Sequence, residues 1–323
     1  MTSASKSKPT RLRVAVMGAG AVGGYLGGIL ARAGHSVALI DRGAHLRAIQ
    51  SNGLRVQAEN SDFIVRVPAT DNPAEIGPVD LVVHAVKTYH NPEAIPMMRP
   101  LVNEGTTVLT IQNGVDSWEQ LNAGLGHSHV LPGAIYIETR VEAPGVVRRQ
   151  GNVYRLVLGE ADGPVTPPTK AIAQAFQAAS LPTEVATDIH KVLWTKWLFI
   201  ATLAGVTTAA HAGIAEVLAV PASRELVIQV MREIEAVGRK RGIDLDKDVV
   251  DKTLRYMENE ARSLKASMQT DMEAGRPMEL EALTGTVVRL GRESGVPTLA
   301  NDTIYRLLKP HELKRQPLPR SEQ

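Results

Sequence analysis

Residues 12–41 read LRVAVMGAGAVGGYLGGILARAGHSVALID. The apolar run Leu12–Met17 is typical of a strand buried on both faces, and glycines follow it directly. The segment Tyr25–Ala33 predicts a helix, and Gly34 stands where helices commonly end. Ser36–Ile40 predicts a second strand. Because a strand–helix–strand crossover is almost always right-handed and joins parallel strands, this stretch predicts an α/β fold.

The alternation of strands and helices continues into the middle of the chain, and the pattern then changes. A helix is expected over 91–101, a hairpin or loop over 141–149, and further strands at 81–86, 106–111, 130–137 and 153–158. After Lys170, apolar residues recur at helical spacing. Helices are expected at 170–180, 188–204, 222–241, 246–274 and 280–294. We therefore predict a Rossmann-type doubly wound sheet followed by an all-helical C-terminal domain.

The length of 323 residues suggests about two domains, and 44% hydrophobic with 22% charged residues is an ordinary globular composition. The first eleven residues, MTSASKSKPTR, are polar and basic and lack the apolar core of a secretory signal. We expect a disordered extension over 1–11, a Rossmann-type domain over 12–185, a helical domain over 186–309, and a flexible tail over 310–323; the motifs below assign the first domain to dinucleotide binding and the second to substrate and catalysis.

Charge and cysteine content exclude several kinds of site. The 36 basic and 34 acidic residues give a net charge of +2, which offers no electrostatic case for binding nucleic acid or an acidic membrane. No apolar stretch reaches about 18 residues, so no membrane span is expected. The chain has no cysteine, which excludes disulfides, thiolate metal ligands and a cysteine nucleophile. That absence fits a reducing compartment, and we expect a cytoplasmic protein.

The glycine-rich turn between the first strand and the first helix has the spacing Gly-x-Gly-x-x-Gly. Gly18 permits the tight turn, Gly20 lets the backbone approach a pyrophosphate, and Gly23 allows close packing of helix on sheet. The N–H groups and the dipole of the helix start then attract phosphate. We therefore predict a nicotinamide dinucleotide site at Gly18, Ala19, Gly20, Ala21, Val22 and Gly23.

Two residues at the end of the second strand point to different coenzymes. Asp41 lies 18 residues after Gly23, where an acid usually accepts hydrogen bonds from the adenosine ribose and favours NAD. Arg42 can instead pair with the 2′-phosphate of NADP, or it can be a solvated charge or stack on adenine. The pair leaves the choice between NAD and NADP open.

Five passages along the chain have a recognisable order and spacing. They are VAVMGAGAVGGYLGGILARAGHSV (14–37), HAVKTYH (84–90), IQNGV (111–115), LWTKWLFIA (193–201) and SMQTDMEAGRPMELEALTG (267–285). With these passages the chain resembles the ketopantoate reductase (2-dehydropantoate 2-reductase) family from about residue 12 to residue 309. The resemblance implies a Rossmann domain joined to a helical domain. It also implies NADPH-dependent reduction of a 2-keto acid, ketopantoate, to the 2-hydroxy acid pantoate, a step of pantothenate biosynthesis.

Lys196 matches the family's general acid. A ketone that accepts a hydride develops negative charge on its oxygen, and a nearby ammonium can stabilise that charge and supply the proton. The neighbours Trp194, Trp197 and Phe199 can lower the pKa of Lys196 towards neutrality. Without the resemblance, Lys196 is better explained as a lysine whose stem packs on an amphipathic helix while its charge stays in water.

Further matched residues extend the implied site. Glu279 matches a glutamate that hydrogen-bonds the substrate hydroxyl and orients the lysine, although an acid is also favoured at a helix start. Ser267 matches a serine that contacts the substrate carboxylate. Asn113 matches an asparagine beside nicotinamide and substrate, and Lys87 a lysine near the cofactor. Taken alone, Ser267 is better explained as an ordinary exposed serine. For Lys87 an exposed loop lysine is the alternative, and for Asn113 the alternative is a plain turn, since Asn-Gly is common in turns.

Two more polar residues are assigned less firmly. Asp271 lies four residues after Ser267 and can support the site from the same helix face. Asn301 matches a family asparagine, or it caps the last helix. The histidines lack metal-ligand spacing and no GxSxG motif occurs, so neither a metal site nor a hydrolase is predicted.

Two positions depart from the family's pattern. Ile200 and Ala204 stand where biosynthetic members carry asparagines that contact the substrate's polar end. Their loss favours a more apolar or otherwise different substrate. Two alternatives therefore stay open: a related NAD-dependent 2-hydroxy-acid dehydrogenase, and a non-catalytic dinucleotide-binding sensor. The apolar helical half can also form a homodimer surface.

Overall fold

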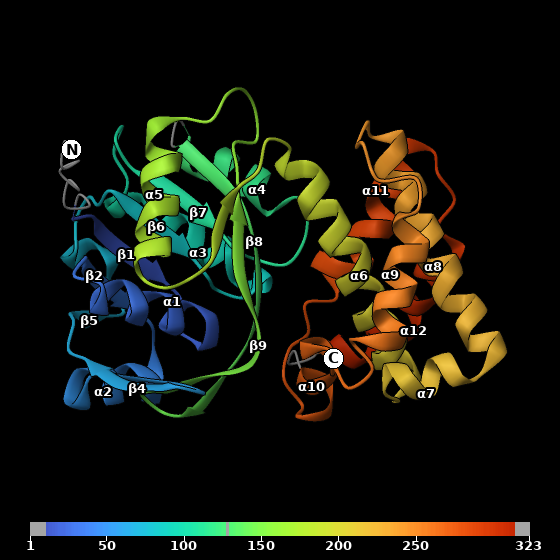
Figure 1. Cartoon of the computed structure of the whole chain (residues 1–323), viewed down its shortest axis with the longest axis horizontal. Coiled ribbons are helices and arrows are strands. Elements are labelled where there is room, and N and C mark those ends of the chain that lie inside the picture. Colours follow the sequence, from blue (N-terminus) through green and yellow to red (C-terminus); the bar gives the residue numbers. More distant parts are fainter. Residues whose placement is uncertain (1–10, 127–128, 314–323) are drawn as a thin grey trace, which may run out of the picture. The chain divides into compact units, whose positions relative to one another are not determined.

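The structure is a computed structural model that describes residues 11–126 and 129–313. It divides into two compact units, coloured mainly blue to green and yellow to red in Figure 1. The first unit contains the residues up to Gln112 together with Asp116–Ile189. The second contains Asn113–Val115 and the residues from His190 onward. Three residues that follow a strand of the first unit are therefore counted with the helical second unit.

Six parallel strands form the central part of the sheet in the first unit. Their spatial order, β5-β2-β1-β6-β7-β8, corresponds to the 3-2-1-4-5-6 order of a Rossmann sheet. The predicted strands at 12–17, 36–40, 81–86 and 106–111 are confirmed to within two residues at each end. The strands are β1 (Arg13–Met17), β2 (Ser36–Ile40), β5 (Ala69–Thr70), β6 (Leu81–His84), β7 (Thr107–Thr110) and β8 (His129–Ala143).

Helices cover both faces of this sheet, because alternate residues of each strand point to opposite faces. Val14 and Val16 of β1 pack in one apolar core with α1 (Ala21–Arg32) and α5 (Pro167–Ala178). Met17 of β1 packs in a second core with α3 (Asn91–Met97) and α4 (Ser117–Leu125). The predicted doubly wound fold is confirmed.

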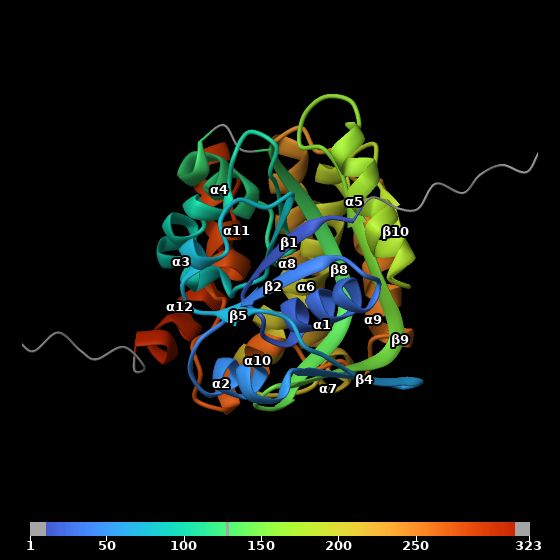
Figure 2. The same ribbon diagram turned by 90° about the vertical axis from the view of Figure 1, so that its left-hand side faces the viewer.

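The sheet extends beyond the Rossmann strands through a long antiparallel ribbon (Figure 2). Strand β8 pairs with β9 (Val146–Leu158), and the turn between them lies in the segment predicted as a hairpin. Strand β9 also pairs in parallel with β3 (Leu54–Ala58) and with β10 (Thr183–Val185). Strand β3 in turn forms an antiparallel hairpin with β4 (Ser61–Val65). The 54–65 hairpin and α2 (Gly43–Asn52) were not among the predicted elements.

The second unit is helical, as predicted, but several helix boundaries differ. The helix predicted over 188–204 extends to Ala210. The segment 246–274 forms two helices separated by residues 260–266, and the segment 280–294 begins with a π-helical turn. Helix α12 continues through Pro310 to Leu313, where a flexible tail was expected. The rest of that expected tail, and residues 1–10 of the expected N-terminal extension, lie outside the described residues. The helices are α6 (Ile189–Ala210), α7 (Ile214–Ala219), α8 (Pro221–Lys240), α9 (Val249–Asn259), α10 (Ser267–Glu273), the π-helical turn η4 (Glu281–Gly285), α11 (Thr286–Ser294) and α12 (Leu299–Leu313).

Helix α6 carries the predicted catalytic lysine. Within residues 11–126 and 129–313 it is the one helix whose length and composition would suit a membrane span, and most of it is buried inside the protein. Helices buried in protein cores have the same length and apolar composition. The apolar character of α6 therefore fits a buried helix.

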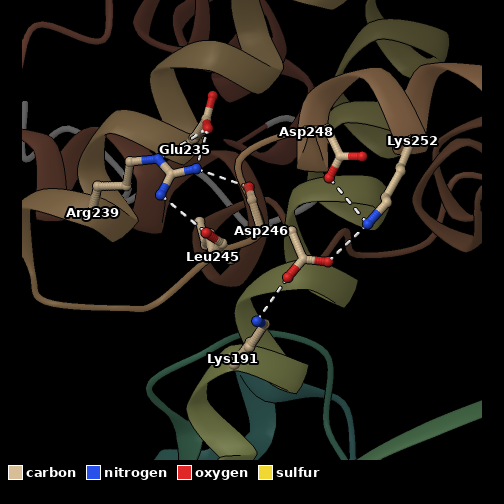
Figure 3. A network of polar contacts seen from close by, with 7 residues as sticks. All are labelled: Lys191, Glu235, Arg239, Leu245, Asp246, Asp248 and Lys252. Atoms are coloured by element: carbon tan, nitrogen blue, oxygen red, sulfur yellow. Dashed lines mark hydrogen bonds and ion pairs between the residues drawn. The ribbon is translucent and has the colours of Figure 1, made fainter.

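A polar network anchors the first turns of α6 (Figure 3). Asp246 pairs with Lys191 of α6 at 2.7 Å and with Lys252 of α9 at 3.1 Å. Arg239 of α8 donates hydrogen bonds to the backbone oxygens of Leu245 and Asp246, at 3.0 and 2.8 Å. The two lysines lower the pKa of the Asp246 carboxyl. These contacts tie three helices together beside the start of α6.

Candidate functional site

The glycine-rich turn has the backbone geometry that its spacing predicts. Gly18 has φ +94°, and a Cβ there would lie 2.8 Å from the Val86 backbone nitrogen. A Cβ on Gly23 would lie 2.0 Å from the Gly18 oxygen, so any larger residue would push α1 away from the turn. At Gly20, by contrast, a Cβ would meet nothing within 4 Å. The open side of the turn is therefore at Gly20, where a pyrophosphate is expected to approach.

The first turn of α1 supplies N–H groups for such a ligand. Gly20 is the residue that precedes the helix, and no side chain caps it. The N–H groups of Gly18 and Ala19 both donate to the Ile40 oxygen at 3.0 Å, which holds the turn against β2. This arrangement fits a dinucleotide phosphate, since the amides of the following residues begin the helix.

Asp41 and Arg42 follow β2 directly. The Asp41 carboxylate accepts a 2.7 Å hydrogen bond from the Arg42 backbone N–H, which orients the carboxylate. The Arg42 guanidinium lies 3.1 Å from His90 Nε2 and 3.7 Å from a Glu93 carboxylate oxygen. Arg42 is exposed and Asp41 is half-buried. The arginine thus contacts the segment after β6 and stays accessible.

A buried network of amide side chains lies at the ends of β6 and β7. Asn91 Oδ1 accepts hydrogen bonds from His84 Nε2 at 3.0 Å and from Gln112 Nε2 at 2.7 Å. Gln112 Nε2 also donates to the Val86 oxygen at 2.8 Å. The predicted cofactor residue Lys87 follows Val86 and is half-buried. No sequence motif indicated this network, which holds the backbone beside both Lys87 and the residue after Gln112.

Lys196 and Asn113 lie together in the second unit. The Lys196 ammonium donates a 2.9 Å hydrogen bond to Asn113 Oδ1. Burial lowers the pKa of Lys196 to about 8, and the charge of Glu279 opposes that shift. An ammonium of this acidity is mostly protonated at neutral pH, yet it gives up its proton far more readily than an ordinary lysine.

The segment that carries Glu279 packs against α6. Trp197, the neighbour of Lys196, is buried and its indole N–H donates a 3.3 Å hydrogen bond to the Ala282 oxygen in η4. Glu279 is buried just before that π-helical turn. Such π-helical turns frequently occur at functional sites. The structure therefore brings together Lys196, Asn113 and the charge of Glu279.

Ser267 and Asp271 differ in their surroundings. Ser267 is exposed at the first residue of α10, and its hydroxyl makes no hydrogen bond to another described residue. Asp271 is buried and accepts a 2.8 Å hydrogen bond from Arg276 Nε. The Asp271–Arg276 pair closes the turn that leads to Glu279. Asp271 therefore fixes the turn before Glu279. A supporting role of Asp271 in the site and a substrate role of Ser267 both stay predictions.

Asn301 takes part in a hydrogen-bonded cap at the start of α12. It is buried in α12, where its side-chain amide donates to a Glu233 carboxylate oxygen at 2.7 Å. The same carboxylate accepts the backbone N–H groups of Ala300 and Asn301, at 2.8 and 3.0 Å. Glu233 of α8 therefore caps α12, and Asn301 holds the cap in place.

Ile200 and Ala204 lie one and two turns after Lys196 on α6. Residues at this spacing share one face of a helix. Ala204 is fully buried and Ile200 is half-buried. The face that continues from the Lys196 ammonium is therefore apolar.

The two halves of the chain match the two domains of one family. Residues 14–163 match the family described as ketopantoate reductase PanE/ApbA, and residues 188–312 match the C-terminal domain of the same family. A 2-dehydropantoate 2-reductase of Mesorhizobium japonicum is 31% identical over 320 residues, covering 92% of this chain and 97% of that protein.

Solved structures share the fold over nearly the whole chain. A PanE/ApbA family ketopantoate reductase from Ralstonia eutropha has a TM-score of 0.87 and 32% identity, covering 94% of this chain and 99% of that one. D-Mandelate dehydrogenase, in its ternary structure with NADH and anilino(oxo)acetate, has a TM-score of 0.85 at 22% identity, covering 94% and 98%, a likeness of fold alone. Because both domains match the family and relatives are more than 30% identical over nearly the whole chain, this chain belongs to the ketopantoate reductase PanE/ApbA family of oxidoreductases.

Proposed function

We propose that this protein is an NADPH-dependent reductase that converts a 2-keto acid to a 2-hydroxy acid, with Lys196 as the proton donor. The observation that carries the proposal is the half-buried Lys196 ammonium, held by Asn113 and acidified to a pKa of about 8. The reduced nicotinamide supplies the hydride when it is bound. Lys196 donates one proton to the carbonyl oxygen, so that the product is a neutral hydroxyl, and the lysine then regains a proton from water.

The surroundings of Lys196 suit this role. Asn113 Oδ1 accepts a hydrogen bond from Nζ, which orients the ammonium without adding a countercharge. The charge of Glu279 stabilises the protonated form, so burial does not discharge the lysine at neutral pH. We further propose that Glu279 accepts a hydrogen bond from the substrate hydroxyl and that Ser267 contacts the substrate carboxylate.

Arg42 is the proposed partner of the coenzyme's 2′-phosphate. It is exposed, follows β2, and has a guanidinium suited to phosphate, while the carboxylate of Asp41 already accepts the Arg42 backbone N–H. An NADH preference through Asp41 is the alternative. Steady-state rates with NADPH and NADH, for the natural chain and for Arg42→Ala, decide between them. Loss of an NADPH preference in Arg42→Ala supports the proposal, and an unchanged ratio contradicts it.

Ketopantoate is the substrate that the family implies, but the apolar face beyond Lys196 favours a 2-keto acid with a less polar side chain. The test is a panel of 2-keto acids that includes ketopantoate, 2-ketoisovalerate and phenylglyoxylate, each assayed with both coenzymes. Turnover of any panel member that is abolished in Lys196→Met supports the proposed reaction. Coenzyme binding without turnover of any 2-keto acid or 2-hydroxy acid would instead indicate a dinucleotide sensor.

A further inference from the structure

His45, in the first turns of α2, bridges two backbone groups that are far apart in the sequence. The Gly145 N–H donates a 3.1 Å hydrogen bond to His45 Nδ1. Because an N–H can only donate, Nδ1 must be unprotonated, and the neutral ring carries its proton on Nε2. Nε2 lies 3.1 Å from the Ala19 oxygen, which can only accept. Both partners therefore require the same tautomer of His45.

The Ala19 oxygen belongs to the peptide that ends at Gly20. In a trans peptide the C=O and the N–H lie in one plane and point in opposite directions, and the described backbone contains no cis peptide. A carbonyl held by His45 therefore aims the Gly20 N–H away from His45. Gly20 is also where the turn is open, since a Cβ there meets nothing within 4 Å.

This peptide needs an external restraint. The preceding N–H groups, those of Gly18 and Ala19, are held by the Ile40 oxygen. Gly20 has no Cβ to limit rotation, so its backbone is intrinsically freer than that of other residues. The His45 hydrogen bond supplies the restraint at the one point of the turn where a phosphate approaches.

We propose that His45 is a positioning residue for coenzyme binding, which orients the Ala19–Gly20 peptide so that the Gly20 N–H donates to the pyrophosphate. This inference rests on the proposed dinucleotide binding and adds a residue outside the glycine motif. His45 acts through the backbone of the turn, and its ring makes no contact with the phosphate in this scheme.

The tip of the β8–β9 ribbon sets the tautomer. Gly145 has φ +76°, and its oxygen accepts a 2.9 Å hydrogen bond from the Arg55 N–H. A Cβ on Gly145 would lie 3.0 Å from the Ala48 Cβ of α2. The tip is therefore held against both α2 and β3, so the Gly145 N–H is a fixed donor to His45.

Two substitutions separate the two hydrogen bonds of His45. In His45→Gln, the side-chain amide nitrogen can take the place of Nε2 and donate to Ala19. In His45→Asn, the side-chain oxygen can take the place of Nδ1 and accept from Gly145, but the side chain is too short to reach Ala19. Each variant loses one hydrogen bond, so thermal unfolding without ligand should be similar, and each serves as the control for the other.

The readout is the dissociation constant for NADPH and NADH, measured by titrating nicotinamide fluorescence. We expect His45→Asn to bind the dinucleotides about three- to tenfold more weakly than the natural chain, which is the usual effect of losing one oriented hydrogen bond. His45→Gln should bind them within about twofold of the natural chain. Equal affinities in the two variants, or the larger loss in His45→Gln, overturn the inference and leave the proposed function intact. Failure of the natural chain to bind either dinucleotide overturns both.

A measurement on the natural chain covers the case in which a variant does not fold. Nitrogen-15 NMR of the histidine rings distinguishes the two neutral tautomers. We expect the His45 signal, assigned by its absence in His45→Gln or by through-bond correlation in the natural chain, to show a protonated Nε2 and a bare Nδ1. The opposite tautomer would remove the donor to Ala19 and overturn the inference.

Discussion

Lys196 Nζ donates a 2.9 Å hydrogen bond to Asn113 Oδ1, so a charged acid candidate is oriented by a neutral amide. A carboxylate at the same position would raise the pKa of the lysine strongly. The amide sets the direction of the ammonium and leaves its pKa at about 8, with the charge of Glu279 as the opposing influence.

Replacing Lys196 by methionine, which keeps most of the side-chain volume, is expected to reduce kcat for the best 2-keto acid roughly 10²- to 10⁴-fold, the usual worth of a positioned acid. NADPH affinity should stay within about twofold, because the loss is confined to the proton-transfer step. Stopped-flow hydride transfer and fluorescence titration measure the two quantities. A variant that retains full turnover would exclude Lys196 as the acid.

Replacing Glu279 by glutamine should move the pH dependence of reduction. Reduction needs protonated Lys196, so the rate falls as pH rises through the lysine pKa of about 8. The charge of Glu279 raises that pKa, so its removal lowers the pKa and shifts the alkaline limb of log kcat to lower pH. Glu281→Gln is a matched control, since the Glu281 carboxylate accepts the Tyr305 hydroxyl at 2.8 Å. An equal shift in both variants would contradict the role of Glu279.

Replacing Ile200 by asparagine should change substrate preference in favour of polar 2-keto acids. The substitution restores a hydrogen-bonding side chain one turn after Lys196. We expect the ratio of kcat/KM for ketopantoate to that for 2-ketoisovalerate to rise roughly tenfold, the effect of one well-placed hydrogen bond. Ile200→Leu keeps the face apolar and should leave the ratio unchanged. A ratio that does not respond to asparagine would show that Ile200 lies away from the substrate.

Local constraints explain why the glycine turn could be predicted. Gly18 has a positive φ, and at Gly23 there is no room for a Cβ. Both requirements arise within six consecutive residues, so a short sequence motif can express them. The role of His45 arises from partners 26 and 100 residues away, Ala19 and Gly145. No spacing rule connects such positions, so the sequence contains no signal for His45 as a neighbour of the turn.

The helix boundaries in the second unit show a second limit of sequence patterns. Residues 260–266 interrupt a predicted helix, yet they contain neither glycine nor proline, and the apolar residues Ala261 and Leu264 keep helical spacing. Turn hydrogen bonds from Ala261 to Tyr256 and from Leu264 to Ala261 replace the helical pattern. Tertiary packing therefore overrides periodicity here, in the connection that leads to Ser267.

The buried histidine of the amide network predicts a stability change with pH. Burial lowers the pKa of His84 to about 4, against about 6.5 in an unfolded chain. Between those values the unfolded state binds a proton that the folded state does not, so stability falls as pH drops from 6.5 towards 4. His84 should therefore lower the free energy of unfolding by roughly 2–3 kcal/mol between pH 7 and pH 4.5.

Urea unfolding of the natural chain and of His84→Gln at both pH values isolates the contribution of His84 to this change. The variant, which cannot titrate at this position, should lose less stability than the natural chain by that amount. Parallel losses would show that His84 is protonated in the folded protein, and the hydrogen bond from its Nε2 to Asn91 would then survive without the neutral ring.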